Sequence, residues 1–243
     1  YLLVAPAEPN DLDDALAALL PVLAPGALQL PGGLRLARPA DDGWQVAVGD
    51  QVRVGEGRVE LPGATVQAVR AWRPPRVAPA PPGAAGAAIT DLLITAAPSP
   101  HLVRRAGEVA AAVLARRADG ATWAPLVGAG PGLTPSGDDA LCGALLALHA
   151  WGRGVEAAAL APAYPRTTAL SSALIEAARQ GFAVPEVVAL ADAVLTGDVL
   201  AVQHHLPAAL AIGHSSGRDL VAGLLGAVQT LTVRLPYPEV SLG

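Results

Sequence analysis

Two adjacent aspartates, a serine and several glycines gather in the segment GAGPGLTPSGDDALCGALLALHAWG, residues 128–152. Only 15% of the chain is charged, so a pair of carboxylates at the start of an apolar run needs an explanation. Such residues either cap a helix or form a site for a charged ligand. A helix N-terminus preceded by glycines offers free backbone amides and the positive end of the helix macrodipole, which suit a phosphate or a carboxylate.

The same arrangement occurs a second time in the chain. SGDD at residues 136–139 and SGRD at residues 216–219 both place Ser-x-x-Asp ahead of an apolar run. This is the capping-box pattern, in which the serine accepts a hydrogen bond from the N3 amide and the aspartate reaches back to the N-cap amide. Each cap stabilises its helix by about 1 kcal/mol. Capping accounts for the serine and the final aspartate of both copies, but not for Asp138, whose counterpart is Arg218.

Two interpretations of this repeat stay open. If the two helix starts face each other, they form one anion-binding site from two related elements. Alternatively, the repeat arises by chance in a chain rich in glycine and alanine, and the motifs are only caps. A short distance between the two helix starts would favour the first interpretation.

The elements that must position these motifs are mainly helices. An apolar face at helical spacing predicts helices over residues 101–120, 136–152, 166–181, 185–198 and 216–231, and a strand over 89–95 stays open. Residues 1–73 contain short runs in which valine alternates with polar residues between glycines, a pattern typical of antiparallel hairpins. The sequence therefore predicts an α+β fold, with an N-terminal antiparallel β part (a small barrel or sandwich) followed by a larger α-helical part.

The change of pattern also predicts the domain organisation. Residues 74–88 are rich in proline and alanine, which is typical of a stiff linker. We expect a β-rich domain over residues 1–73 and a mainly helical domain over residues 89–243. The alternative for the proline-rich segment is a surface loop within one domain.

Composition excludes several classes of function. The net charge is −5 and there is no long basic run, which argues against a nucleic-acid partner. The apolar runs are too short to cross a membrane, and the first residues lack the features of a signal peptide. The single cysteine, Cys142, cannot form an internal disulfide, so we expect a cytoplasmic protein. The chain also lacks a P-loop lysine, a serine nucleophile elbow and a dinucleotide fingerprint.

Three motifs together point to a known family. They are GLTPSGDD at residues 132–139, RTTALSS at 166–172 and GHSSGRDLVAG at 213–223. In this order they resemble the DUF2877 family, which includes a subunit of the oxamate carbamoyltransferase of allantoin degradation. The resemblance implies chemistry on carbamoyl groups, in which oxalurate and phosphate give oxamate and carbamoyl phosphate during purine nitrogen catabolism. Because that enzyme has several unrelated subunits, it also implies a hetero-oligomer, and a non-catalytic ligand-binding or assembly subunit is the alternative.

Carbamoyl transfer needs a site for an anion, a stabilised carbonyl oxygen and an oriented attacking atom. We expect Asp138, Asp139 and His214 to be the catalytic residues. The expected substrate-binding residues offer amides, hydroxyls, a guanidinium or a carboxylate, and they are Gly132, Thr134, Ser136, Gly137, Arg166, Thr167, Ser215, Ser216, Gly217 and Asp219.

Alternatives stay open for three of these side chains. Asp138 stabilises the helix N-terminus, holds a Mg²⁺ ion that bridges to phosphate, or orients an amide nitrogen of the substrate. No other cofactor is implied. Arg166 is either a guanidinium that binds phosphate or carboxylate, or a surface residue. His214 is either an acid, base or oxyanion donor, or a loop histidine bonded to the backbone.

Overall fold

The computed structural model describes the helical part of the chain and short stretches of the part before it. The described residues are 2–3, 18–21, 34–36, 50–51, 53–56, 58–62, 64–67, 74–80, 86–97 and 99–234. The chain divides into two compact units, Tyr1–Pro74 and Pro75–Gly243.

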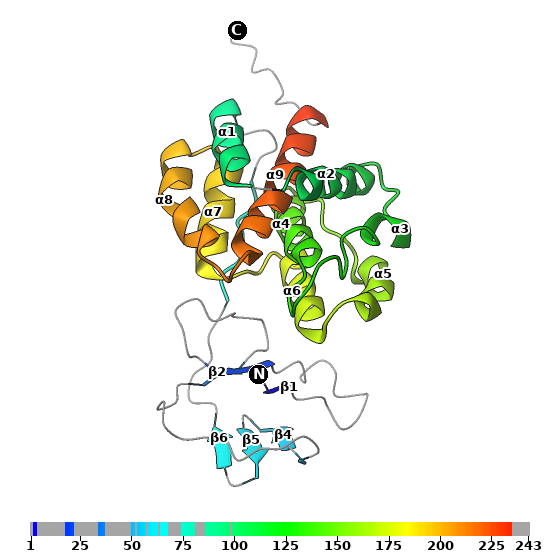
Figure 1. Ribbon diagram of the computed structural model, residues 1–243, viewed down its shortest axis with the longest axis vertical. Helices are drawn as coiled ribbons and strands as arrows, with labels where there is room; N and C mark the ends of the chain where they lie inside the picture. The colour runs from blue at the N-terminus through cyan, green and yellow to red at the C-terminus, as the bar shows by residue number, and fades with distance from the viewer. Residues whose placement is uncertain are drawn as a thin grey trace. The chain divides into compact units, whose positions relative to one another are not determined.

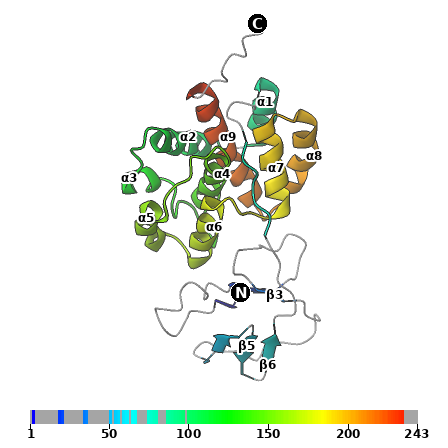
Figure 2. The same cartoon turned by 180° about the vertical axis from the view of Figure 1, so that it is seen from behind.

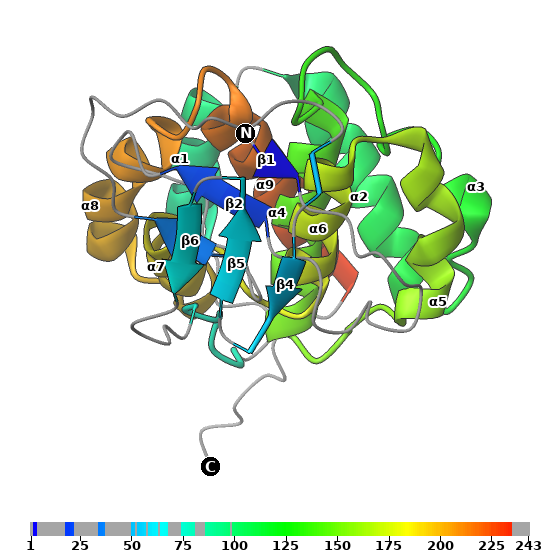
Figure 3. The ribbon, with the colours of Figure 1, turned by 90° about the horizontal axis from the view of Figure 1, so that it is seen from below.

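The strands of the first unit form two three-stranded sheets. In one, β1 (Leu2–Leu3) pairs antiparallel with β2 (Ala18–Pro21), and β2 pairs parallel with β3 (Leu34–Leu36). In the other, β4 (Arg53–Gly55), β5 (Arg58–Leu61) and β6 (Ala64–Gln67) pair antiparallel in chain order (Figure 3). The longest of these strands has four residues.

The predicted α+β fold with an N-terminal antiparallel barrel or sandwich is wrong. The structure is mainly helical, and the described strands of residues 1–73 form neither a barrel nor a sandwich. Strands of two to four residues are shorter than the usual five or six. Alternation of valine with polar residues specifies only which side chains share a face. It does not determine whether a sheet closes or stacks on another one.

The second unit is built from helices (Figures 1 and 2). They are α1 (Ala87–Ala96), α2 (Pro100–Leu114), α3 (Gly120–Trp123), α4 (Ser136–Ala150), α5 (Ala157–Leu160), α6 (Ala169–Arg179), α7 (Pro185–Thr196), α8 (Val199–Leu210) and α9 (Ser216–Arg234), with a 3₁₀ helix, η2, over Ala161–Arg166. The five predicted helices are present as α2, α4, α6, α7 and α9. Residues 89–95, where a strand stayed open, lie in α1. Within the described residues, no helix is long and apolar enough to cross a membrane.

Helix α4 is the central element of this unit. It packs against α2, α6, α7 and α9, and all its residues are buried except Ser136 and His149 (Figure 1). A helix that is apolar on every side must be buried on every side, which explains this position. Its charged side chains, Asp138 and Asp139, lie in the first turn and are buried with it.

Two glycines let α4 and α9 cross at very short range. A Cβ atom on Gly143 would lie 2.0 Å from the carbonyl oxygen of Leu220, and one on Gly223 would lie 1.8 Å from that of Ala140. Neither distance can accommodate a side chain. The backbones therefore touch about two turns after each Ser-x-x-Asp motif begins, and this contact holds the starts of the two helices close together.

Part of the predicted linker packs on the helical unit. The amide of Val77 donates to the carbonyl of Gly181 over 2.9 Å, and that of Ala80 donates to the carbonyl of Ala150 over 2.9 Å. The amide of Ala78 donates to the carboxylate of Asp192. Residues 75–80 are thus attached to the helices, whereas the domain boundaries predicted at residues 73 and 89 stay a prediction.

Candidate functional site

The two related helix starts are neighbours in space. The hydroxyl of Thr134, just before α4, lies 3.2 Å from the hydroxyl of Ser216, the first residue of α9. With the glycine contact between α4 and α9, this hydrogen bond joins the GLTPSGDD and GHSSGRD motifs at one place. The arrangement favours a common role for the two motifs.

The caps of these helices differ from the predicted capping boxes. Helix α4 takes Pro135 as its N-cap, a residue with no side-chain oxygen, so Ser136 is already inside the helix. In α9 the amide of Asp219 donates to the backbone carbonyl of Ser215, and Ser216 is again the first helical residue. The predicted capping role of both serines is therefore wrong by one residue, and their partners in the sequence, Asp139 and Asp219, are left for other contacts.

Asp138 is fully engaged by the protein. Its side chain is only 1% exposed, one carboxylate oxygen accepts from the amide of Gly128 over 2.8 Å, and the other accepts from the hydroxyl of Thr167. Gly128 has a φ of 74°, and a Cβ atom there would lie 2.0 Å from the carbonyl oxygen of Arg166. Asp138 therefore joins the glycine loop to the RTTALSS segment.

Asp139 and Asp219 are the two buried acids with unused oxygens. Each is 6% exposed, and the Oδ2 atom of each has no hydrogen-bond partner among the described residues. Burial raises the pKa of Asp139 to about 7; a hydrogen bond from Ser216 lowers it, whereas the negative charges of Asp219 and Asp138 raise it. The hydroxyls of Thr134 and Ser216 are hydrogen-bonded to each other, and either one can be the donor.

The rim of this site is a pair of exposed loops. Residues 130–133, before α4, and residues 213–215, before α9, are exposed, and they include Gly132, His214 and Ser215. The amides of Gly137 and Gly217, by contrast, donate to the carbonyls of Ala129 and Ile212. These two amides are therefore used inside the protein, and the exposed loops are the surface that a ligand can reach.

The RTTALSS segment is held against the first loop. Thr168, the N-cap of α6, donates to the carbonyl of Leu133 over 2.6 Å, and the buried hydroxyl of Ser171 donates to the same carbonyl over 3.3 Å. The exposed side chain of Arg166 donates to the carbonyl of Ala124. All three motifs thus converge. Ser171 was not among the site residues predicted from the sequence. The hydroxyl of Thr168 accepts from the backbone amide of Ser171, a contact that does not depend on the serine side chain.

A metal site has little support in this geometry. In the part of the chain that the structure describes, no three His, Cys, Asp or Glu side chains lie close enough to hold an ion. Both oxygens of Asp138, the predicted Mg²⁺ ligand, already accept hydrogen bonds from the protein. The Mg²⁺ ion stays a prediction.

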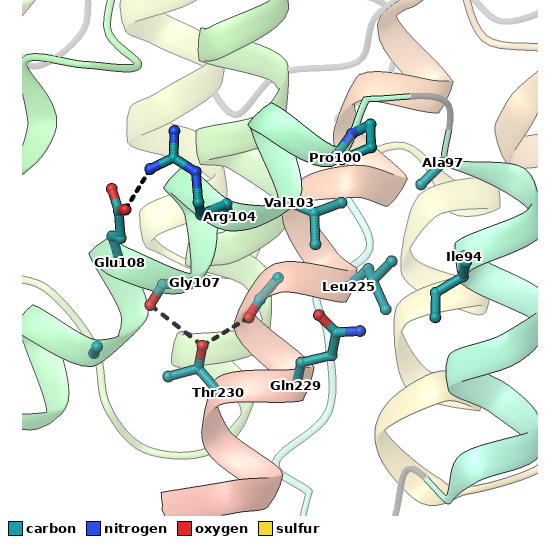
Figure 4. A pocket seen from close by; sticks show the side chains of 12 residues that line it. Ile94, Ala97, Pro100, Val103, Arg104, Gly107, Glu108, Leu225, Gln229 and Thr230 are labelled. Atoms are coloured by element: carbon teal, nitrogen blue, oxygen red, sulfur yellow. Dashed lines mark hydrogen bonds and ion pairs between the residues drawn. The ribbon is translucent and has the colours of Figure 1, made fainter.

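A separate hollow of about 700 Å³ lies where α1, α2 and α9 meet (Figure 4). Its lining is largely apolar and includes Ile94, Val103 and Leu225, while the ion pair of Arg104 with Glu108 lies at its side. None of the predicted site residues lines it. The hollow and the converging motifs are therefore different places on the helical unit.

The sequence matches one known family over the region that holds these motifs. Residues 126–228 match the family described as oxamate carbamoyltransferase subunit AllH. The match spans α4 to α8 and about two thirds of α9, and it confirms the resemblance inferred from the three motifs. No curated protein and no solved structure matches the chain.

Proposed function

We propose that this chain is a subunit of a carbamoyltransferase and that its site lies at the adjoining starts of α4 and α9. The family match over residues 126–228 supports the reaction class. The hydrogen bond between Thr134 and Ser216, which joins the two helix starts, is the observation that supports the location. The substrates would be oxalurate and phosphate in one direction, and oxamate and carbamoyl phosphate in the other.

The electrostatics of the site suit anionic substrates. The positive ends of two long helices meet there, and each is preceded by an exposed loop with glycines in positive φ conformations, such as Gly132 and Gly213. Backbone amides at helix starts bind phosphate and carboxylate groups without a charged side chain. Arg166, which is exposed beside the loop, supplies a guanidinium for the second anionic group.

The buried acids supply the proton that the reaction needs. A phosphate oxygen bonds to the carbamoyl carbon of oxalurate, the bond from that carbon to the oxamate nitrogen breaks, and the nitrogen takes up a proton. Asp139, with a pKa of about 7, donates this proton in its acid form and regains one from the phosphate. The exposed His214 is a second proton donor at the rim. Asp138 positions the loop instead of reacting.

The alternative function is a ligand-binding or assembly subunit without its own activity. Its support is the family description, which names a subunit and not a complete enzyme. In that case the site would bind the same anions, and turnover would require other chains. The two functions differ in whether the purified chain alone converts oxalurate.

The test is ligand binding, followed by activity, in the full chain. We expect phosphate, carbamoyl phosphate or oxamate to raise the melting temperature, because a ligand that binds only the folded state stabilises it by RT ln(1 + [L]/Kd). Deletion of both buried carboxylates, Asp139→Ala with Asp219→Ala, should remove the shift. Asp192→Asn, which lies against Ala78 in the predicted linker, is the matched control and should keep it.

Each result of this test separates the two functions or rejects both. Production of carbamoyl phosphate by the chain alone would reject the non-catalytic subunit. Activity only after other subunits are added would support that alternative. Equal thermal shifts in the wild type and the double variant would show that the site lies elsewhere.

A further inference from the structure

The two unused oxygens at the centre of the proposed site need a hydrogen-bond donor. Buried carboxyl oxygens nearly always accept a hydrogen bond, because burial removes their hydrogen bonds to water and an unpaired oxygen has none to replace them. Oδ2 of Asp139 and Oδ2 of Asp219 break this rule, although they come from two different helices and lie within electrostatic range of each other. Within the described residues, the groups that shift the pKa of Asp139 are Ser216, Asp219 and Asp138, and none of them is a cation.

Two features argue for an N–H donor and against a metal ion as the missing partner. In the portion of the chain described here, no third acid, histidine or cysteine completes a metal site around the pair. The starts of α4 and α9 also direct their positive ends at this place, which disfavours a cation and favours an anion nearby. A neutral donor attached to an anion fits both conditions.

A primary amide has the matching set of donors and acceptors. Its nitrogen carries two N–H groups, one for each acid, and its carbonyl can accept from an acid that retains its proton. Asp139 is partly protonated near neutral pH because burial raises its pKa to about 7, so the pair offers both a donor and acceptors. Neither a methyl group nor a free carboxylate can make these bonds.

We propose that Asp139 and Asp219 together bind the primary amide end of the substrate, while the glycine loops and helix starts bind its anionic end. This inference rests on the proposed function and names the ligand class of the same site, a small molecule with a –CO–NH₂ group next to a carboxylate or phosphate. Oxamate and carbamoyl phosphate both have this form. The hydroxyls of Thr134 and Ser216 separate to admit the amide, since their hydrogen bond joins the two helix starts that carry the pair.

Matched ligands test this inference directly. Pyruvate differs from oxamate, and acetyl phosphate from carbamoyl phosphate, only by a methyl group in place of the NH₂ group. We expect the full chain to bind oxamate at least tenfold more tightly than pyruvate in titration calorimetry, and carbamoyl phosphate at least tenfold more tightly than acetyl phosphate. Pyruvate should still bind, because its carboxylate is unchanged.

Variants of Asp139 and Asp219 test whether these two acids cause the preference for oxamate over pyruvate. Asp139→Asn and Asp219→Asn each keep the side-chain size but replace an acceptor with an NH₂ group, and each should reduce the preference for oxamate by about tenfold. Asp192→Asn makes the same chemical change away from the site and should keep the full preference. Circular dichroism at the helical bands checks that each variant is folded, and the wild-type comparison stands even if a variant fails to fold.

Different failures point to different errors. Equal binding of oxamate and pyruvate by the wild type would overturn the inference while leaving the anion site of the proposed function intact. Binding that requires Mg²⁺ and ignores the NH₂ group would overturn it in favour of a cation between the two acids. If none of the four ligands binds, both this inference and the proposed site are wrong.

Discussion

At the scale of single residues, the two adjacent aspartates have different environments. The sequence accounts for Asp139 as a cap and leaves Asp138 as the site residue. In the structure, Asp138 satisfies both oxygens with Gly128 and Thr167, and Asp139 keeps an unpaired oxygen beside Ser216. The reason is the start of α4, which takes Pro135 as its N-cap and so turns Asp139 away from the role of a capping residue.

Removal of the Asp138 carboxylate should destabilise the fold. Asp138→Ala leaves the half-buried amide of Gly128 and the half-buried hydroxyl of Thr167 without their acceptor, at about 1–3 kcal/mol for each group. We therefore expect the free energy of unfolding, measured with urea, to fall by about 3 kcal/mol. Asp91→Asn, at an exposed position of α1, is the control and should change it by less than about 0.5 kcal/mol. If Asp138→Ala unfolds at the same urea concentration as the wild type, the Asp138 carboxylate does not stabilise the fold.

At the scale of elements, the crossing of α4 and α9 explains why the motifs meet. Gly143 and Gly223 occupy equivalent positions in the two copies of the motif, and each lies against the backbone of the other helix. The repeat in the sequence is therefore a repeat in space, with two helices that approach each other through the same small residue. Sequence reasoning found both helices from their apolar period but had no means of pairing them.

A methyl group at this crossing should separate the helices. Gly143→Ala would place Cβ 2.0 Å from the carbonyl of Leu220, so the backbones must move apart, which costs about 3 kcal/mol. We expect the melting temperature to fall and the binding of oxamate to weaken with it, because Asp139 moves relative to Ser216. Gly120→Ala is the control, since nothing lies within 4 Å of its Cβ position, and it should leave both quantities near wild type. If Gly143→Ala is as stable as the wild type, the backbones of α4 and α9 do not approach as closely at this crossing as the structure has them.

Helices α1 and α8 are among the helices that local pattern does not predict. Helix α1 follows a proline-rich stretch and contains β-branched residues, which favour strands, and α8 contains Pro207, which lacks a backbone donor. Both are helical because neighbouring helices cover their apolar side chains, such as Leu93 in α1 and Val202 in α8. Tertiary packing outweighs intrinsic preference in these segments.

At the scale of the whole molecule, a cluster around Arg76 adds to the backbone hydrogen bonds that attach residues 75–80 to the helices. Arg76 donates from Nη2 to Nε2 of His149 over 2.9 Å and from Nε to the carbonyl of Gln180, and it lies over the ring of Phe182. His149 Nδ1 lies 3.1 Å from the carbonyl of Arg179. These contacts require a neutral imidazole with its proton on Nδ1, because Nε2 must accept from the guanidinium.

This cluster should make the stability depend on pH. Burial and the Arg76 charge lower the pKa of His149, so the unfolded chain, with an ordinary histidine pKa of about 6.5, takes up the proton first. The contribution of His149 is therefore present above about pH 6.5 and is lost as the pH falls through its folded pKa. NMR titration of the ring should give a pKa below 6.5 in the wild type and a higher one in Arg76→Ala. Identical pKa values in the two proteins would exclude the Arg76 guanidinium as a cause of the lowered pKa. The variant His149→Gln identifies the NMR signal of His149 among those of the five histidines.

The sequence by itself determined the helix positions of the central motifs, the repeat of Ser-x-x-Asp and the resemblance to a known family over residues 126–228. These depend on local signals: apolar period, glycine and short motifs whose residues lie close together in the chain. Only the tertiary structure decided which of the two adjacent carboxylates keeps an oxygen without a hydrogen-bond partner. The partners of Asp138 and Asp139 are Gly128, Thr167 and Ser216, and whether an oxygen is paired depends on segments far apart in the chain that packing brings to the same place.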